Sequence, residues 1–210
     1  MSDEPTIGIL RMPMGNLRSA YNAIYENGFD PLFVDSDTSF DHLTHLIVPG
    51  VGNFKAVMGH LEKDGLAGRI RAFAASGRPL LGICAGMQLL ARCGTESGIT
   101  EGLDLIGGTV TRLPEGGGRL LPHVGWSTVK IRVPHAIFEG IKPGRDFYFV
   151  HSYAMHTDRD EECIGETEYG EPFASIVAKD NVVGFQFHPE KSQANGLKLL
   201  ENFCRWDGRC

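Results

Sequence analysis

The chain has 210 residues, of which 42% are hydrophobic and 22% charged, and its formal net charge is −6 at pH 7. This is the balance of one ordinary globular domain over residues 1–210, and the excess of acid disfavours binding to nucleic acid or to an anionic membrane. The sequence shows neither a signal peptide nor a membrane-spanning run. Its five cysteines are scattered, without metal-site spacing or a disulfide framework. We therefore expect a cytoplasmic protein without metal or other cofactor.

The first half of the chain alternates predicted strands with predicted helices. The strand patterns are short and mostly apolar, at residues 6–10, 31–34, 45–48 and 79–83. Apolar residues at helical spacing lie at 17–24, 54–61 and 66–74, and a further helix is expected to begin near Gly86. Apolar strands that alternate with amphipathic helices predict a parallel sheet covered on both faces.

The second half is richer in predicted strands. Their ranges are 105–113, 125–133, 147–154, 174–179 and 182–187, and a last helix carries Leu197, Leu200 and Phe203. Asp180 and Asn181 have the pattern of a hairpin turn between the last two strands. The whole pattern predicts an α/β fold with a mixed, mainly parallel central sheet flanked by helices.

The segment Gly82-Ile83-Cys84-Ala85-Gly86 joins a predicted strand to a helix and has the form of a nucleophile elbow. A sharp turn of this kind crowds its flanking positions, so only small residues fit there. Cys84 would stand at a helix N-terminus, where the dipole and free N–H groups favour a thiolate. The N–H of Ala85 would be placed to donate to an oxyanion. A buried structural cysteine is the alternative.

A histidine and a glutamate follow the last predicted strand. His188 is a candidate general base and acid, and Glu190 can hold its imidazole in one tautomer and one orientation. Without this pair Cys84 would have no base, so the two motifs support each other. His151 is the rival base. Because it lies among large apolar neighbours, we expect it to have a structural or substrate-lining role.

The loop at residues 49–52 also follows a predicted strand and contains Gly50, Val51 and Gly52. Two glycines let the backbone approach a ligand closely and point N–H groups at it. The loops after the first, third and fourth strands all fall at the carboxyl edge of the sheet, where open α/β sheets bind ligands.

Two other patterns do not indicate a site. The three glycines at 116–118 lack the Gly-Lys-Ser/Thr continuation of a phosphate-binding loop, so a flexible loop is expected. Asp41, His42 and His45 have no further ligand cluster around them, and a solvated surface is expected.

The motifs together resemble the class I, triad-type glutamine amidotransferases, and within them the glutaminase subunits of imidazole glycerol phosphate synthase. The resemblance covers essentially the whole chain. It is carried by segments 49–52, 82–90, 123–126, 149–153 and 186–192, which occur in the family's order. One departure is Ala85, which stands where this family usually has Leu. The resemblance implies a flavodoxin-like fold.

The resemblance also implies a reaction. Cys84 would attack the side-chain carboxamide of glutamine, His188 would protonate the departing ammonia and then activate water, and Glu190 would orient His188. The same resemblance implies two binding groups. The oxyanion and substrate groups would be Ala85, Gly50, Val51, Gly52, Gln88, Ser152 and Tyr153.

A partner is implied as well. The ammonia would pass to a separate (β/α)8-barrel synthase subunit, forming a heterodimer in which Asn16, Tyr148 and Lys191 match interface positions of the family. The subunit would be nearly silent until that partner binds its own substrate. The acceptor reaction would be the one that makes imidazole glycerol phosphate and the ribonucleotide AICAR in histidine biosynthesis.

Three alternatives remain open at this point. Paralogues of the subunit supply ammonia for amino-sugar modification in surface-polysaccharide pathways. A stand-alone cysteine hydrolase acting on γ-glutamyl compounds would show glutaminase activity without any partner. A binding module would keep the fold but would not react with a glutamine-analogue alkylator.

Overall fold

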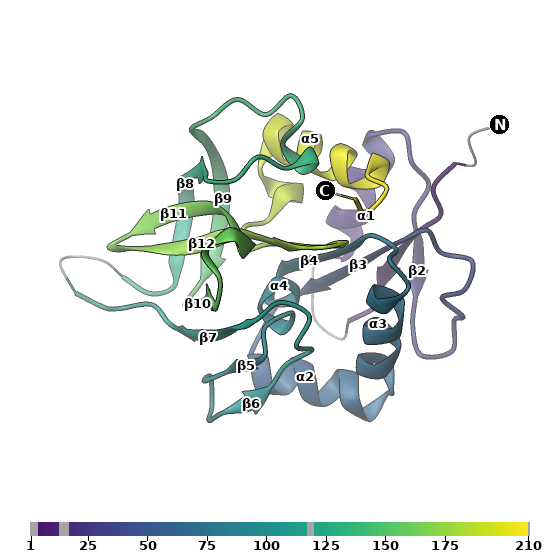
Figure 1. The fold of residues 1–210 in the computed structure, drawn as a ribbon, viewed down its shortest axis with the longest axis horizontal. Coiled ribbons are helices and arrows are strands. Elements are labelled where there is room, and N and C mark those ends of the chain that lie inside the picture. The colour runs from purple at the N-terminus through teal and green to yellow at the C-terminus, as the bar shows by residue number, and fades with distance from the viewer. Residues whose placement is uncertain (1–3, 13–16, 117–119, 210) are drawn as a thin grey trace.

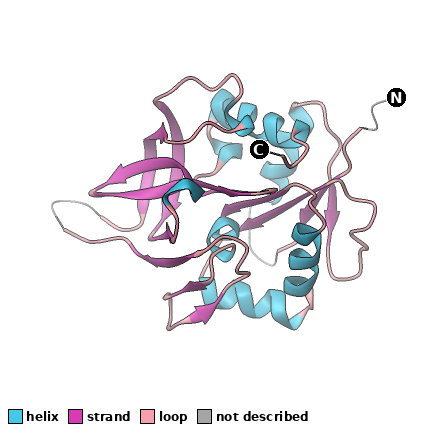
Figure 2. Ribbon diagram, viewed as in Figure 1, coloured by secondary structure: helices cyan, strands magenta, loops and turns pink. Residues whose placement is uncertain are grey.

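The computed structural model describes residues 4–12, 17–116 and 120–209. Its described strands join one mixed sheet, with helices packed against the parallel part (Figures 1 and 2). Five parallel strands lie side by side in the order β2-β1-β3-β4-β13. These are β1 (Ile7–Leu10), β2 (Leu32–Val34), β3 (His45–Gly50), β4 (Leu80–Cys84) and β13 (Val182–Phe185).

Helices cover both faces of the parallel strands. Figure 1 shows α2 (Phe54–Lys63) and α3 (Leu66–Ala75) on one side, and α1 (Leu17–Glu26) and α5 (Gln193–Arg205) on the other. Each pair buries its own apolar cluster against the sheet. Because β1, β3, β4 and β13 are buried along their whole length, their continuous apolar runs are explained by this double cover.

The second half of the chain extends the sheet mostly in antiparallel fashion. From β13 the path continues through β12 (Glu171–Lys179), β10 (Tyr153–Thr157) and β7 (Gly108–Arg112) to the short β5 (Cys93–Gly94) and β6 (Thr100–Glu101), the pairing of β5 with β7 being parallel. A branch runs from β12 through β11 (Cys163–Tyr169) and β8 (His123–Ile131) to β9 (Arg145–His151). The expected mixed sheet flanked by helices is confirmed. Short helical segments are α4 (Ala85–Leu89), η1 (Ala136–Phe138), η2 (Asp160–Glu162) and η3 (Pro189–Lys191).

The prediction of one continuous strand over residues 147–154 is wrong. The segment forms two strands, because the chain bends at Ser152 and each half finds a different neighbour: β9 pairs with β8, whereas β10 pairs with β7 and β12. A run of β-forming residues carries no mark of such a change of partner. The bend presents Ser152 and Tyr153 to the carboxyl edge of the sheet.

The expectation of a solvated surface is also wrong for His45, although Asp41 and His42 are exposed. His45 is buried at the start of β3, and its Nε2 atom lies 2.9 Å from the carbonyl oxygen of Trp206, which ends α5. Burial lowers the pKa of His45, so the ring ties the C-terminal helix to the sheet as a neutral group.

In the described ranges, no group of His, Cys, Asp and Glu side chains is arranged to hold a metal. Nor is any described helix both long and apolar enough to cross a membrane.

Candidate active site

Cys84 stands at the junction of β4 and α4 in a backbone conformation that non-glycine residues rarely adopt, with φ 54° and ψ −113°. The neighbouring glycines make this turn possible. A Cβ atom on Gly86 would lie 1.8 Å from the carbonyl oxygen of Val48, and one on Gly82 would lie 2.6 Å from the carbonyl oxygen of Gly86. The predicted nucleophile elbow therefore has the tight packing that its glycines indicated.

The N–H groups of the first turn of α4 have no partner within the helix. Ala85 is the first residue of this turn, follows Cys84 directly and lines the same cavity. A negative charge that develops on a carbonyl oxygen beside the sulfur can accept a hydrogen bond there. The geometry thus fits the predicted role of Ala85 as an oxyanion donor.

His188 and Glu190 form a buried pair at the end of the segment that follows β13. Their Nδ1 and Oε1 atoms lie 2.9 Å apart, and the exposed fractions of the two side chains are 7% and 4%. The backbone of His188 is fixed at both ends: its N–H donates to the carbonyl of Tyr148 at 2.9 Å, and its carbonyl accepts from the hydroxyl of Ser192 at 2.7 Å. The imidazole is therefore oriented from three directions.

The charge state of His188 follows from its neighbours. Burial opposes a charged ring, but hydrogen bonds with Cys84 and Glu190, together with the negative charges of both groups, raise the pKa of His188 to about 10. The ring is therefore an imidazolium at neutral pH. Its proton is in place before any substrate binds, and a cation stands beside the sulfur of Cys84.

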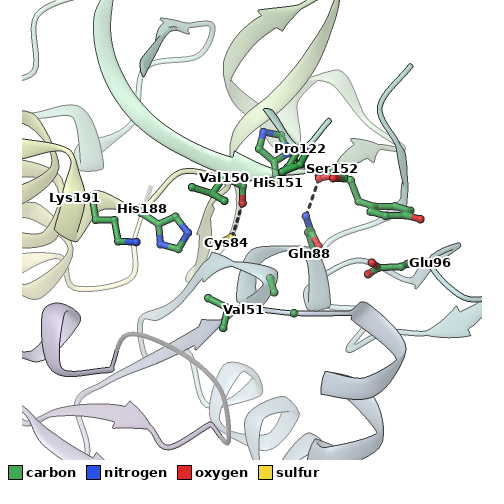
Figure 3. Close-up of a pocket in the computed structure, with 13 residues that line it drawn as sticks. Val51, Cys84, Gln88, Glu96, Pro122, Val150, His151, Ser152, His188 and Lys191 are labelled. Carbon is green, nitrogen blue, oxygen red and sulfur yellow. Dashed lines mark hydrogen bonds between the residues drawn. The ribbon is translucent and has the colours of Figure 1, made fainter. Parts of the chain in front are cut away.

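One cavity of about 310 Å³ brings most of the predicted residues together. Figure 3 shows His188 and Lys191 on one side of Cys84, and Gln88 and Glu96 on the other. The sequence-predicted residues that line it are Cys84, His188, Ala85, Gln88, Val51, Gly52, Ser152, Tyr153 and Lys191, together with the rival base His151. The carboxylate of Glu96 lies beyond Gln88, on the side of the cavity away from the Cys84–His188 pair (Figure 3).

The loop at residues 49–52 lies beside the elbow because β3 and β4 are adjacent parallel strands. Gly50 is the register partner of Cys84, and a Cβ atom on Gly50 would lie 2.6 Å from the backbone nitrogen of Gly86. Val51 and Gly52 line the main cavity, whereas Gly50 lines a smaller space that also touches His188 and Glu190. Gly52 has φ 110°, a conformation that favours glycine.

Gln88 lies one helical turn after the elbow, and its side chain is held by two acceptors. Its Nε2 atom donates to the carbonyl of Tyr153 at 2.8 Å and to Oε1 of Gln186 at 3.0 Å. The bend at Ser152 carries Tyr153 to this position. The predicted glutamine-binding residues Gln88, Ser152 and Tyr153 are thus parts of one hydrogen-bonded wall.

Two of the three predicted interface residues, Tyr148 and Lys191, lie beside the cavity. Asn16 lies outside the described residues. Lys191 lies at the mouth of the cavity, and its Nζ atom is 6.0 Å from the centre of the ring of Tyr148. Trp126, which is 47% exposed, meets the same ring edge to face, with ring centroids 5.9 Å apart. Tyr148 and Lys191 thus belong to an aromatic and basic patch beside the cavity.

Several residues of the site carried no signal in the sequence. Glu96 lines the cavity and accepts a hydrogen bond from the N–H of Phe54 at 2.7 Å, but its loop resembles any polar turn. The carbonyl oxygen of Val150 lies 3.8 Å from the sulfur of Cys84. Pro122 lines the cavity too. Gln186 was visible only as part of a motif, and its side chain is completely buried.

The geometry can be compared with known proteins. Residues 14–206 match the family model described as glutamine amidotransferase class-I. The chain belongs to the class I glutamine amidotransferase family. As this amidotransferase matches the model over nearly its whole length, the expectation from its motifs is confirmed, and it is an enzyme.

Among the relatives of this amidotransferase are two proteins that carry the same subunit name. A Desulfitobacterium hafniense protein is 44% identical over 200 residues, covering 95% of this chain and 94% of the relative. An Aquifex aeolicus protein is 44% identical over 193 residues, covering 91% and 92%. Both are named imidazole glycerol phosphate synthase subunit HisH.

Solved structures share the fold at low sequence identity. A structure from Thermotoga maritima described as PurLQS has a TM-score of 0.76 at 18% identity and covers 96% of this chain and 98% of that one. A crystal structure described as a glutamine amidotransferase has a TM-score of 0.74 at 21% identity, with coverage of 95% and 97%. These likenesses support the amidotransferase fold.

Proposed function

We propose that this chain is the glutaminase subunit of an imidazole glycerol phosphate synthase and works as a heterodimer with a (β/α)8-barrel synthase subunit. It hydrolyses glutamine to glutamate and passes the ammonia to the barrel, which makes imidazole glycerol phosphate and AICAR in histidine biosynthesis. The supporting observation is the elbow cysteine that shares one cavity with the buried His188–Glu190 pair, in a chain 44% identical to two HisH subunits. The free thiols of the described cysteines suit a cytoplasmic location.

The first half of the reaction forms a thioester. The sulfur of Cys84 bonds to the carboxamide carbon of glutamine, and the carbonyl π electrons move to the oxygen, where the N–H of Ala85 and the loop at Val51 and Gly52 can stabilise the charge. The C–N bond then breaks. The leaving nitrogen takes the proton that His188 already carries, so ammonia departs rather than an amide anion.

The second half releases glutamate. Neutral His188 takes a proton from water, the hydroxide oxygen bonds to the thioester carbon, and the C–S bond breaks to return the thiolate of Cys84. Glu190 keeps the imidazole in one orientation through both halves. At the far end of the cavity the carboxylate of Glu96 is placed to pair with the α-ammonium group of glutamine.

The partner would dock on the patch formed by Trp126, Tyr148 and Lys191. An exposed tryptophan beside a tyrosine is typical of an interface centre, where aromatic side chains supply contact area, and Lys191 adds a positive charge at its edge. The patch adjoins the cavity mouth, so ammonia released at Cys84 has a short way to travel. A stand-alone hydrolase would have no need of this surface.

Rescue of a histidine auxotroph tests the assignment. A strain that lacks its glutaminase subunit is supplied with this gene and its cognate barrel, and growth without histidine is expected; Cys84→Ala is the control and should not rescue. If the strain fails to grow while a sugar-modifying synthase is activated by the same chain, the paralogous function is correct. Full glutaminase turnover by the isolated chain would instead favour the stand-alone hydrolase.

A further inference from the structure

A line of buried and partly buried hydrogen bonds runs from β8 to the wall of the reaction cavity. His123 on β8 is the register partner of His151 on β9, and Nδ1 of His123 lies 3.1 Å from Nε2 of His151. On the outer side, Nε2 of His123 lies 2.8 Å from the hydroxyl of Ser127. On the inner side, Nδ1 of His151 lies 2.9 Å from the carbonyl oxygen of Tyr153. Aromatic rings enclose the two imidazoles: Phe149, Tyr169 and Phe173.

The Tyr153 carbonyl fixes the direction of every bond in this line, because a carbonyl oxygen only accepts. His151 must donate through Nδ1. Burial lowers the pKa of His151 to about 3, so the ring is neutral and its Nε2 atom accepts. His123 must therefore donate through Nδ1. Burial lowers the pKa of His123 to about 4, which leaves Nε2 to accept from the Ser127 hydroxyl. Both rings are the Nδ1–H tautomer.

The Tyr153 carbonyl also determines the orientation of two side-chain amides at the cavity, those of Gln88 and Gln186. It accepts from Nε2 of Gln88 at 2.8 Å, and that nitrogen donates in turn to Oε1 of Gln186 at 3.0 Å. A reversed Gln88 would place oxygen against two acceptors, so its Oε1 atom must face the other way. With its oxygen occupied, Gln186 turns its nitrogen toward the sulfur of Cys84, 4.0 Å away. That N–H group is placed to donate to the sulfur.

We propose that His123 and His151 are positioning residues for glutamine hydrolysis. Through the Tyr153 carbonyl they hold the orientation in which Gln88 offers an oxygen to the bound substrate and Gln186 offers an N–H to the Cys84 sulfur. The inference rests on the proposed glutaminase function and adds two histidines: His151, which lines the cavity, and His123, which lies behind it. Groups that orient a reacting side chain from behind can matter as much as direct contacts, because small misplacements are costly.

The tautomers can be observed directly in the full-length chain. Histidine labelled with ¹⁵N gives one pattern of ring nitrogens for a neutral Nδ1–H imidazole, another for Nε2–H and a third for imidazolium. Spectra of His123→Asn and His151→Asn assign the two rings. The expected result is the neutral Nδ1–H form for both at neutral pH. An Nε2–H tautomer or an imidazolium at either position would overturn the proposal, whatever the enzyme's activity.

Kinetics test the positioning role. In His123→Asn the side-chain amide can stand where Nδ1–H stood, whereas His123→Phe fits the aromatic surroundings but donates nothing. We expect the Phe variant to lose about tenfold in kcat/KM for glutamine, the value of one hydrogen bond, and the Asn variant to lose about threefold or less. Equal losses in the two variants would contradict the relay. Ser127→Ala removes only the outermost hydroxyl and should fall between wild type and His123→Phe.

A readout independent of turnover separates this proposal from the proposed function. Alkylation of Cys84 by iodoacetamide should be slower in His123→Phe and in Gln186→Met than in wild type, and nearly unchanged in His123→Asn, with unfolding midpoints measured alongside. If His123→Phe alkylates more slowly than wild type but wild type hydrolyses no glutamine with its barrel partner, the proposed function is wrong, whereas the effect of His123 on the Cys84 sulfur stands. If His123→Phe folds and alkylates like wild type, the relay is wrong. Should that variant not fold, Gln186→Met and the tautomer spectra decide.

Discussion

His188 and Glu190 share one short hydrogen bond, from Nδ1 to Oε1 at 2.9 Å, while the second carboxylate oxygen of Glu190 is buried without a partner among the described residues. A buried carboxylate with a single hydrogen bond is costly unless a cation stands beside it. The imidazolium of His188 is that cation. The pair is therefore more stable when the ring is charged than when it is neutral.

The first prediction concerns stability and pH. Because the pKa of His188 rises from its usual 6.5 to about 10 in the folded protein, the stabilisation from its charge is complete below about pH 6.5 and is lost as pH rises through about 10. Glu190→Gln removes part of that stabilisation. The difference in free energy of unfolding between wild type and Glu190→Gln should be largest near pH 6 and shrink toward pH 10, by urea denaturation. A difference that grows with pH would contradict the charged pair.

The second prediction separates glutamine hydrolysis by this chain from synthesis by the barrel partner. Cys84→Ala should abolish glutamine hydrolysis, because only the sulfur can form the thioester, yet leave synthesis from added ammonium salts by the barrel partner intact. Cys93→Ala, which changes a cysteine outside the cavity, is the matched control and should keep both activities. Glutamate release by Cys84→Ala at the wild-type rate would show that the nucleophile is another group.

The third prediction ranks the members of the triad. His188→Asn should be nearly as damaging to turnover as loss of Cys84, whereas Glu190→Gln should be roughly 10- to 100-fold less damaging, because the orienting carboxylate is usually the least costly member. Steady-state glutaminase assays of the complex measure all three. His151→Asn tests the rival base, and a larger loss of kcat there than in His188→Asn would overturn the assignment.

The fourth prediction concerns the elbow glycines. Gly86→Ala forces a Cβ atom to within 1.8 Å of the Val48 carbonyl oxygen, so we expect a loss of about 2 kcal/mol or more in the free energy of unfolding. Gly68 is the matched control, because it lies in α3 with nothing within 4 Å of an added Cβ atom. Gly68→Ala should stabilise the protein by about 0.5–1 kcal/mol. Similar thermal unfolding midpoints for the two variants would contradict the packing described.

The fifth prediction concerns activation. The isolated chain should have little glutaminase activity and should be switched on when a (β/α)8-barrel partner carries its own substrate. The loop at Val51 and Gly52 is the suggested switch, because glycine lets a peptide plane turn and supply an oxyanion donor, and one such donor changes rates by about 10²–10³. Tyr148→Ala and Lys191→Ala should weaken the stimulation more than the basal rate. Equal basal and stimulated rates in wild type would rule out the switch.

The parallel half of the fold was predictable because each of its signals is local. An apolar run followed by an amphipathic helix is typical of a buried parallel strand and the helix that covers it. The elbow at Cys84 and the pair at His188 and Glu190 directly follow such runs, so they were expected at strand ends. The three loops could be brought to one edge from the sequence alone, since parallel strands in one sheet all end on the same side.

The antiparallel half was less accessible. Strands β5, β6 and β11 were missed, and β9 and β10 were merged, because their limits depend on which distant strand each residue pairs with. Glu96 was not predicted as a cavity residue for the same reason. Its position depends on how its loop packs against the start of α2, where it accepts a hydrogen bond from the N–H of Phe54. His45 was misplaced because burial beside Trp206 depends on the far end of the chain.

Tyr148 serves His188 through its backbone alone. Its carbonyl accepts the N–H of His188, and its own N–H donates to Ser192, while its ring faces outward to Trp126 and Lys191. Every residue type except proline has the same main-chain groups, so the ring can be exchanged without losing these two hydrogen bonds. Lineages descended from such a protein can therefore diversify in what they recognise while inheriting the chemistry unaltered.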